Sequence, residues 1–199
     1  MVAATPLDIA PGPQAEQRMV IHASWKDYVL IRDVLDGPGL LMAYSEGVLE
    51  LMSPGPAHEF AKTNIGRFVE QYAYVRGIDL RGYGSTTLKD EAKQRGAEPD
   101  ECYVVGKKLV DYPEIAIEVV QTSPLVDKLG IYLAFGVSEV WVFRDGAFTL
   151  HLLDAAKAAY ASARSSRLLP GLDFDVLARF VVRDDTLVAL REFEALVRG

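Results

Sequence analysis

The sequence predicts an α/β (α+β) fold, in which helices flank a mixed β-sheet. Its central part shows a long helical pattern, three strand signals, a second helical pattern and a further strand, an order that places helices against a sheet. Half of the 199 residues are hydrophobic, enough to bury one core. We expect residues 1–17, rich in Pro, Ala and Gly, to form a flexible N-terminal tail, and residues 18–199 to form a single domain.

An N-terminal helix and a β-hairpin are predicted ahead of the main sheet. Ser24 can cap a helix over residues 24–36, and Gly37-Pro38-Gly39 can end it. Residues 40–54 show two strand patterns joined by a Ser-Glu-Gly turn, which indicates a hairpin. Residues 57–76 keep apolar side chains at helical spacing and predict a longer helix.

The second half of the chain alternates strand and helix signals. A helix after the third strand can be capped by Thr122 or Ser123, with Pro124 in its first turn and Gly136 at its end. The strand patterns lie at residues 79–88, 101–105, 114–120, 139–143, 148–153 and around 165–170. A final helix is predicted over residues 186–197.

Composition and charge exclude several classes of protein. The net charge of −7 argues against a broadly basic nucleic-acid clamp, although a local basic rim stays possible. The single cysteine, Cys102, cannot form an internal disulfide and is expected in the core. The first residues lack the pattern of a signal peptide, and no apolar segment is long enough to cross a bilayer. We therefore expect a cytoplasmic protein without membrane contact.

Two carboxylates, Asp100 and Glu118, flank one predicted turn. If residues 101–105 and 114–120 form a hairpin that pairs Val105 with Pro113, the same register pairs Asp100 with Glu118. Directly opposed residues lie about 5 Å apart on one face, close enough to hold one divalent cation. The register is an assumption, and a slip by one or two residues would separate the two acids.

Glu118 interrupts a strand that is apolar on both faces, which predicts burial. A buried carboxylate is costly unless it is paired, hydrogen-bonded, metal-bound or protonated. A salt bridge to Arg or Lys, or a position at a solvent-facing strand end, is the plain alternative to metal binding. Taken alone, Glu118 favours that alternative.

Lys128 follows Glu118 by ten residues, at the margin of the apolar face of the predicted helix. Because the connecting loop is short, its ammonium group can be directed at the two carboxylates. The alternative is a lysine that extends to solvent.

Acid, acid and lysine in this order suit metal-assisted phosphodiester cleavage. Carboxylate oxygens favour Mg²⁺ or Mn²⁺, and we expect Asp100, Glu118 and the backbone carbonyl of Val119 as metal ligands. The ion would polarise the phosphoryl group and activate water, while Lys128 would orient that water or stabilise the transition state.

Three further residues are accessory candidates. His58 lies on the inward stripe of the long helix and could contact metal or substrate, but a capping or core histidine is equally consistent. Gln121 could supply a polar contact or simply cap a loop. Glu50 is the weaker candidate, because its strand could have a polar face.

Several stretches resemble the Uma-two family of the PD-(D/E)XK, restriction-endonuclease-like superfamily. The resemblance runs from about residue 40 to 153, over the stretches GVLELMSPGPAHEF, AEPDECYVV and PEIAIEVVQTSPLVDKLGIYLAFGVSEVWVFRDG. Its most specific part is K-x-x-x-Y-x-x-x-G-V, formed by Lys128, Tyr132, Gly136 and Val137.

The resemblance implies a restriction-endonuclease-like core with a four-stranded mixed sheet. It implies that Asp100 and Glu118 bind metal, that Lys128 is the catalytic lysine, and that His58 matches the histidine after the family's M-S-P segment. One departure is clear: the superfamily usually has lysine two residues after the acid, where this chain has Val120. The lysine is then supplied from the helix.

The leading functional hypothesis is a Mg²⁺-dependent endonuclease that hydrolyses DNA phosphodiester bonds. The alternative is a non-catalytic module that keeps the nuclease fold for binding or assembly, which the acidic net charge favours. Hydrolysis of another phosphoester is a third reading. A homodimer is also expected, because two-fold symmetry suits an enzyme that engages both strands of a duplex.

Overall fold

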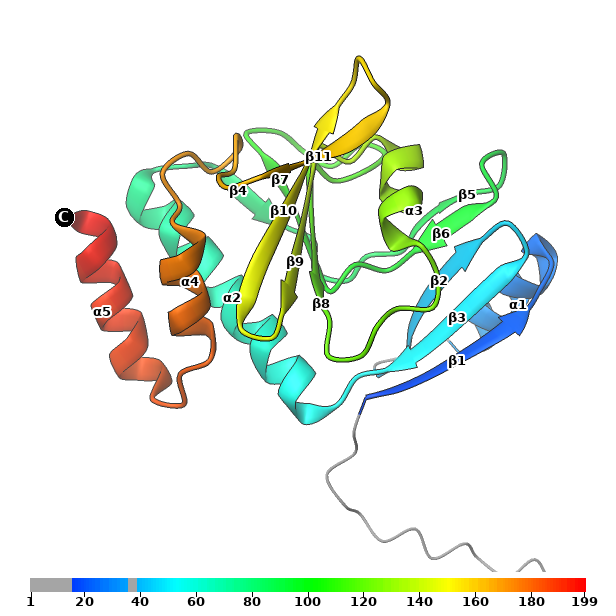
Figure 1. Ribbon diagram of the computed structural model, residues 1–199, viewed down its shortest axis with the longest axis horizontal. Coiled ribbons are helices and arrows are strands. Elements are labelled where there is room, and N and C mark those ends of the chain that lie inside the picture. The colour runs from blue at the N-terminus through cyan, green and yellow to red at the C-terminus, as the bar shows by residue number, and fades with distance from the viewer. Residues whose placement is uncertain (1–15, 36–38) are drawn as a thin grey trace, which may run out of the picture.

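The computed structural model describes residues 16–35 and 39–199, which form two β-sheets and five helices (Figure 1). The smaller sheet contains, in spatial order, β1 (Gln17–His22), β3 (Val48–Ser53), β2 (Leu41–Ser45), β6 (Arg95–Ala97) and β5 (Leu88–Asp90). The larger sheet contains β11 (Ala159–Ala163), β10 (Ala147–Asp154), β9 (Glu139–Arg144), β8 (Ile115–Val119), β7 (Glu101–Val105) and β4 (Leu80–Gly82). The helices are α1 (Trp25–Val34), α2 (Pro56–Arg76), α3 (Lys128–Phe135), α4 (Phe174–Val181) and α5 (Thr186–Arg198).

The larger sheet is mixed, as the sequence predicts. Strands β8 and β9 run parallel, and every other neighbouring pair in this sheet is antiparallel. The parallel pair needs a crossover connection, which α3 supplies. All five residues of β8 are buried, which explains why this strand is apolar on both faces.

Helices cover both faces of the larger sheet. On one face, α2, α4 and α5 pack in a layer, which lies at the left of Figure 1. On the other face, α3 lies between the larger sheet and the smaller one, packing Ile131 and Phe135 against Ala116 and Val140 of the larger sheet. The start of α3 and the end of β8 therefore come together beside the smaller sheet.

Two hairpins have the same turn chemistry. Glu46-Gly47 joins β2 to β3, and Asp145-Gly146 joins β9 to β10, with positive φ at all four residues. Two consecutive residues with positive φ form a type I′ turn, whose twist matches that of the flanking strands. The predicted hairpin within residues 40–54 is confirmed.

The predicted start of α3 is wrong. The helix begins at Lys128, and the carboxylate of Asp127 caps it by accepting a hydrogen bond from the backbone N–H of Gly130 at 3.0 Å. Thr122 does not cap the helix: its backbone N–H and hydroxyl donate to Glu16, and its hydroxyl oxygen accepts a hydrogen bond from Arg18 at 3.0 Å. The predicted end at Gly136 is confirmed, with φ of 74°.

Other boundaries also differ from the predictions. Glu16 and Gln17, assigned to the N-terminal tail, lie at the start of β1, a strand that was not predicted. The single strand expected over residues 79–88 is replaced by β4 and β5, which belong to different sheets. The strand expected around residues 165–170 is absent there, because Ser166 accepts hydrogen bonds from the N–H groups that follow it.

The first helix begins as predicted. Ser24 and Asp27 form a capping box, in which each side chain accepts a hydrogen bond from the other residue's backbone N–H. The helix ends at Val34, and Gly37 and Pro38, expected as its stop signals, lie outside the described residues. Within the described part of the chain, no helix combines the length and the hydropathy that a bilayer crossing requires.

Candidate metal centre and adjoining cleft

Asp100 directly precedes β7, and Glu118 lies in β8, the antiparallel partner of β7. The register pairs Glu101 with Ile117, Cys102 with Ala116 and Tyr103 with Ile115. Extended by one residue, the same register would set Asp100 opposite Glu118, and the charge of Asp100 raises the pKa of Glu118, so the two acids lie close together. The paired residues of β7 and β8 keep the register that the sequence analysis assumed. At the end of the ladder the backbone N–H of Asp100 donates to the carbonyl of Ile117 at 3.1 Å, one residue out of that register.

Asp100 is completely buried, and one of its carboxylate oxygens accepts no hydrogen bond from a described residue. Its Oδ2 accepts a hydrogen bond from the backbone N–H of Val119 at 2.7 Å and lies 3.2 Å from Nε2 of His58. Oδ1 has no hydrogen-bond partner among the described residues. A buried carboxylate oxygen without a donor is costly, and a bound cation would satisfy it.

Glu118 has both carboxylate oxygens engaged. Oε2 accepts a hydrogen bond from the Lys128 ammonium group at 2.7 Å, and Oε1 accepts one from the Tyr132 hydroxyl. Burial raises the pKa of Glu118, the Lys128 charge opposes that rise, and the Asp100 charge adds to it. The salt bridge considered as the plain alternative is therefore present, at the position where a metal ligand is expected.

Lys128 is the first residue of α3, and its side chain is 10% exposed. Burial acts to lower its pKa, but the charges of Glu118 and Asp100 outweigh burial, so the pKa is raised. The ammonium group stays protonated and lies within the field of both carboxylates. From the first turn of α3 the Lys128 side chain contacts Glu118, and no hydrogen bond or ion pair with Asp100 is present among the described residues.

Tyr132 is a site residue that sequence reasoning missed. It lies four residues after Lys128, so both side chains leave α3 on the same face and meet the same carboxylate. Burial and the Glu118 charge raise the pKa of Tyr132 well above its usual value, which keeps the hydroxyl a hydrogen-bond donor. The signal is the K-x-x-x-Y spacing of the family motif, in which the sequence alone assigns no role to the tyrosine.

His58, near the start of α2, contacts two of the three expected metal ligands. Its Nε2 lies 3.1 Å from the carbonyl oxygen of Val119 and 3.2 Å from Oδ2 of Asp100. Burial acts to lower its pKa, but the hydrogen bond to Asp100 and the Asp100 charge outweigh burial, so the pKa is raised. In turn, these contacts with His58 and the Lys128 charge overcome the effect of burial on Asp100 and lower its pKa.

Glu50 lies apart from the acid pair and holds the loop before α3. Its Oε2 accepts hydrogen bonds from the backbone N–H groups of Leu125 and Val126 at 2.6 and 2.9 Å, and its Oε1 forms an ion pair with Arg18. Gln121 is exposed and lines a separate hollow with Phe60 and Phe143. The structure does not bring Glu50 or Gln121 to the two acids.

A cleft of about 550 Å³ opens beside Glu118 and Lys128. Its polar lining includes Arg18, Arg144, Thr149, His151 and Asp127. Its apolar wall is formed by Val120, Pro124, Leu125, Val126, Leu129, Val140 and Val142. The cleft therefore joins the acid–lysine cluster to cationic and apolar surface, in a protein whose overall charge is negative.

The donor atoms fit a magnesium or manganese site that is completed by water and substrate. Among the described residues, no group of three or more His, Cys, Asp and Glu side chains could hold a metal ion. The centre instead offers two opposed carboxylates and the nearby carbonyl of Val119. Mg²⁺ is usually bound in this way, by one or two carboxylates with waters and substrate phosphate oxygens.

A mixed sheet with helices on both faces agrees with the restriction-endonuclease-like core that the resemblance implies. Residues 25–178 match the model of the Uma2 family, described as "Putative restriction endonuclease". The chain belongs to this family, which confirms the resemblance inferred from the sequence. The curated proteins contain no significant match to the chain.

One similar solved structure is a crystal structure described as a putative nuclease belonging to DUF820 from Anabaena variabilis ATCC 29413. It shares 12% sequence identity with this chain, with a TM-score of 0.51. The match covers 71% of this chain and 91% of the other. At this identity the likeness shows the fold, and the predicted restriction-endonuclease-like core is confirmed.

Proposed function

We propose that the protein is a metal-dependent endonuclease that hydrolyses phosphodiester bonds in DNA. The observation that carries the proposal is the opposed pair Asp100 and Glu118, with the Lys128 ammonium group 2.7 Å from Glu118 at the edge of a cleft. The family description and the nuclease fold of the similar structure support the same reaction class.

Asp100, Glu118 and the carbonyl of Val119 would hold Mg²⁺ or Mn²⁺. The bound ion would supply Lewis-acid polarisation of the phosphoryl group and a more acidic water. Asp100 is kept ionised by His58 and Lys128, which prepares it as a ligand. The unpartnered Oδ1 of Asp100 supports this role.

Lys128 would act on the reacting phosphate through charge. Its ammonium group is protonated, so it can donate a hydrogen bond to a phosphoryl oxygen or to the attacking water, and it cannot accept a proton. Tyr132 would position Glu118 through its hydroxyl. Glu50 would position Lys128 by fixing the preceding loop.

A second candidate is a non-catalytic module in which this cluster only stabilises the fold. The observation that favours it is the complete internal pairing of Glu118, whose two oxygens are satisfied by Lys128 and Tyr132. A structural ion pair in a sheet core would show the same contacts.

Cleavage of plasmid DNA and of labelled oligonucleotides, with Mg²⁺, Mn²⁺ or a chelator, distinguishes the two candidates. We expect Glu118→Gln and Lys128→Met each to lower the cleavage rate by at least about a hundredfold, as when a charge-stabilising group is removed from an active site. Wild-type rates in Glu118→Gln would refute the assigned mechanism, and absence of wild-type cleavage would favour the non-catalytic module.

Glu139→Gln is the matched control. Glu139 is also a buried glutamate of the larger sheet, but its carboxylate binds the Trp141 ring N–H and the backbone N–H groups of Arg167 and Leu168. We expect this variant to lose stability and to keep its cleavage rate below its melting temperature. Thermal unfolding of all variants separates loss of chemistry from loss of fold.

A further inference from the structure

Three cationic side chains line the cleft beside the candidate metal centre, and two of them are already paired. Lys128 binds Glu118, and Arg18 forms ion pairs with Glu16 and Glu50. Arg144 is exposed, and its side chain makes no hydrogen bond or ion pair with another described residue. The cleft therefore contains one guanidinium group that is available to a ligand.

The sheet register places Arg144 close to the candidate metal centre. Glu118 lies beside Val142 in the parallel pair of β8 and β9. Arg144 follows Val142 by two residues, so it lies on the same face, about 7 Å further along the strand. Because the type I′ turn at Asp145-Gly146 follows directly, the backbone that carries Arg144 has a defined position.

Strand β10 adds two hydrogen-bonding side chains to the same face. Thr149 pairs with Val142, and His151 pairs with Val140, and both line the cleft with Arg144. Burial lowers the pKa of His151, so its ring is neutral near pH 7 and can donate one hydrogen bond. A guanidinium, a hydroxyl and an imidazole on one face form a set of donors typical of phosphate contacts.

We propose that Arg144, with Thr149 and His151, forms a binding subsite for a backbone phosphate of the nucleic acid, next to the phosphodiester that is cleaved. This inference rests on the proposed nuclease function and identifies how the cleft holds the substrate. Neighbouring nucleotides rise by about 3.4 Å along one strand, so a phosphate one or two nucleotides from the cleaved bond comes within reach of Arg144.

The shape of the cleft favours a nucleotide chain over a free phosphate ion. Its volume of about 550 Å³ is in the range of sites that enclose larger ligands. Beside the polar set lies an apolar wall that includes Val120, Val142 and Leu125, and Leu125 is 62% exposed. The sugar or base that accompanies the phosphate can pack against this wall, whereas a lone ion would leave it in water.

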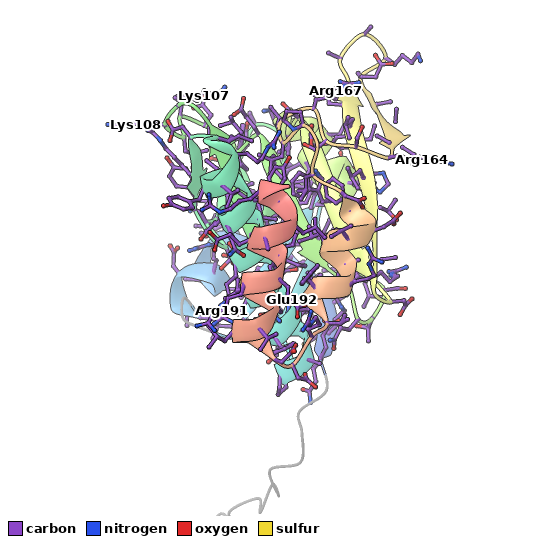
Figure 2. All side chains as sticks on the ribbon, turned by 90° about the vertical axis from the view of Figure 1, so that its left-hand side faces the viewer. Lys107, Lys108, Arg164, Arg167, Arg191 and Glu192 are labelled. Carbon is purple, nitrogen blue, oxygen red and sulfur yellow. The ribbon has the colours of Figure 1, made fainter. Side chains whose placement is uncertain are left out.

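Arg144→Gln tests the subsite, with Arg191→Gln as its matched control. Arg191 is also an exposed arginine without a side-chain partner among the described residues, but it lies on α5, in the helix layer on the opposite side of the larger sheet (Figure 2). Both substitutions remove one positive charge from the surface. A general effect of charge on DNA binding is therefore the same for both.

Binding is measured by fluorescence anisotropy with labelled single-stranded and duplex DNA at several salt concentrations. Each substitution is placed in the Glu118→Gln protein and measured with a chelator present, so that the probe stays intact even if this variant retains metal-dependent cleavage. We expect Arg144→Gln to weaken binding about tenfold and to lower the slope of log K against log salt by about one, as loss of one phosphate contact requires. We expect Arg191→Gln to leave both quantities unchanged and Arg144→Lys to restore part of the affinity.

The outcomes separate this inference from the proposed function. Equal binding of the Arg144→Gln and Arg191→Gln proteins, or no binding of either DNA by the protein with Arg144 intact, overturns the phosphate subsite. Unchanged cleavage by Glu118→Gln overturns the catalytic assignment, while a binding loss in Arg144→Gln still supports the subsite. In a cleaving protein, Arg144→Gln should raise KM and leave kcat within about twofold, because the contact is made in both ground and transition states.

Discussion

Glu118 is the residue at which the structural role and the proposed catalytic role meet. Its carboxylate is nearly buried and is held by Lys128 on one oxygen and Tyr132 on the other. These contacts supply the counter-charge and hydrogen bonds without which a carboxylate inside an apolar sheet would be protonated or unstable. They also orient the carboxylate, so that the proposed metal binding would start from a defined geometry.

Tyr132→Phe tests this positioning role. Removing the hydroxyl deletes a buried hydrogen bond to a carboxylate, so we expect the free energy of unfolding to fall by about 1.5–3 kcal/mol. The lost hydrogen bond no longer stabilises the ionised form, so the pKa of Glu118 rises further. The acidic limb of the cleavage-rate profile should then move to higher pH, because metal ligands must be deprotonated.

Tyr103→Phe provides the comparison. Tyr103 is also a fully buried tyrosine of the larger sheet, but its hydroxyl has no hydrogen-bond partner among the described residues. Chemical denaturation should show little or no loss of stability in this variant. An equal loss in Tyr103→Phe and Tyr132→Phe would show that the hydroxyl of Tyr132 contributes nothing specific.

The raised pKa of Glu101, the neighbour of Asp100, predicts that the stability of the protein depends on pH. Burial, with the charges of Glu70 and Asp100, raises its pKa to about 7, against the opposing charge of Lys62. A folded-state pKa above the unfolded value of about 4.3 means that the folded state binds the extra proton, so stability is lost as pH rises from about 4.3 to 7.

Glu101→Gln should remove this loss. Above pH 7 we expect the variant to be more stable than wild type by about 1–2 kcal/mol, after allowance for partial solvent screening of Glu101. Below about pH 4 the two proteins should have equal stability, because both side chains are then neutral. Urea unfolding across this pH range measures the difference, and a constant offset at every pH would contradict the assigned pKa.

At the scale of elements, the loop over residues 120–127 connects the candidate metal centre to the smaller sheet. Glu50 on β3 binds its backbone at Leu125 and Val126, while Glu16 binds it at Thr122. Arg18 on β1 joins the two glutamates. The smaller sheet thus determines where α3 begins, and therefore where Lys128 lies.

Glu50→Ala should disturb both stability and cleavage. It leaves Arg18 without one of its two carboxylate partners and two backbone N–H groups unpaired, and breaking such a buried pair costs about 3–5 kcal/mol. We also expect slower cleavage in the remaining folded protein, because the loop no longer fixes Lys128.

Glu98→Ala controls for destabilisation alone. Glu98 is buried and paired with Arg32 in the same half of the molecule, but it does not contact the loop before α3. The Glu98→Ala protein should lose stability and retain its cleavage rate when assayed well below its melting temperature. Equal rates in the two folded variants would refute the positioning role of Glu50.

The sequence predicted local features of these elements more accurately than long-range ones. The register of β7 against β8 followed from two apolar strands and one turn, all within about twenty residues. The start of α3 could not be predicted from local sequence, because Glu16 binds the predicted cap Thr122 from 106 positions away. Strand β1 was missed for the same reason, since its partner β3 lies in a separate part of the chain.

At the scale of the whole molecule, net charge is a poor guide to the candidate site. The chain carries a net charge of −7, yet Arg18, Lys128 and Arg144 line one cleft beside the acid pair. Folding brings these three together from β1, α3 and β9, a grouping that no stretch of the sequence displays. The acidic balance therefore does not argue against a nucleic-acid substrate as strongly as the sequence alone indicated.

The family match and the fold cover most of the chain. The candidate site within that fold is a proposal. Residues 25–178 match the family model, and that span contains both acids, the lysine and Arg144. The contacts from Glu16 and Arg18 come from outside the matched span. Self-association stays a prediction, which light scattering of the purified protein would test.

The central claim is that Asp100 and Glu118 share one divalent metal ion. A crystal structure with Mn²⁺, located by anomalous scattering, tests it most directly. We predict one manganese ion bound by Oδ1 of Asp100, a Glu118 oxygen and the Val119 carbonyl, with Lys128 still near Glu118, and no such ion in Asp100→Asn. A well-ordered site without manganese at saturating concentration, with the Lys128–Glu118 and His58–Asp100 contacts unchanged, would contradict the claim.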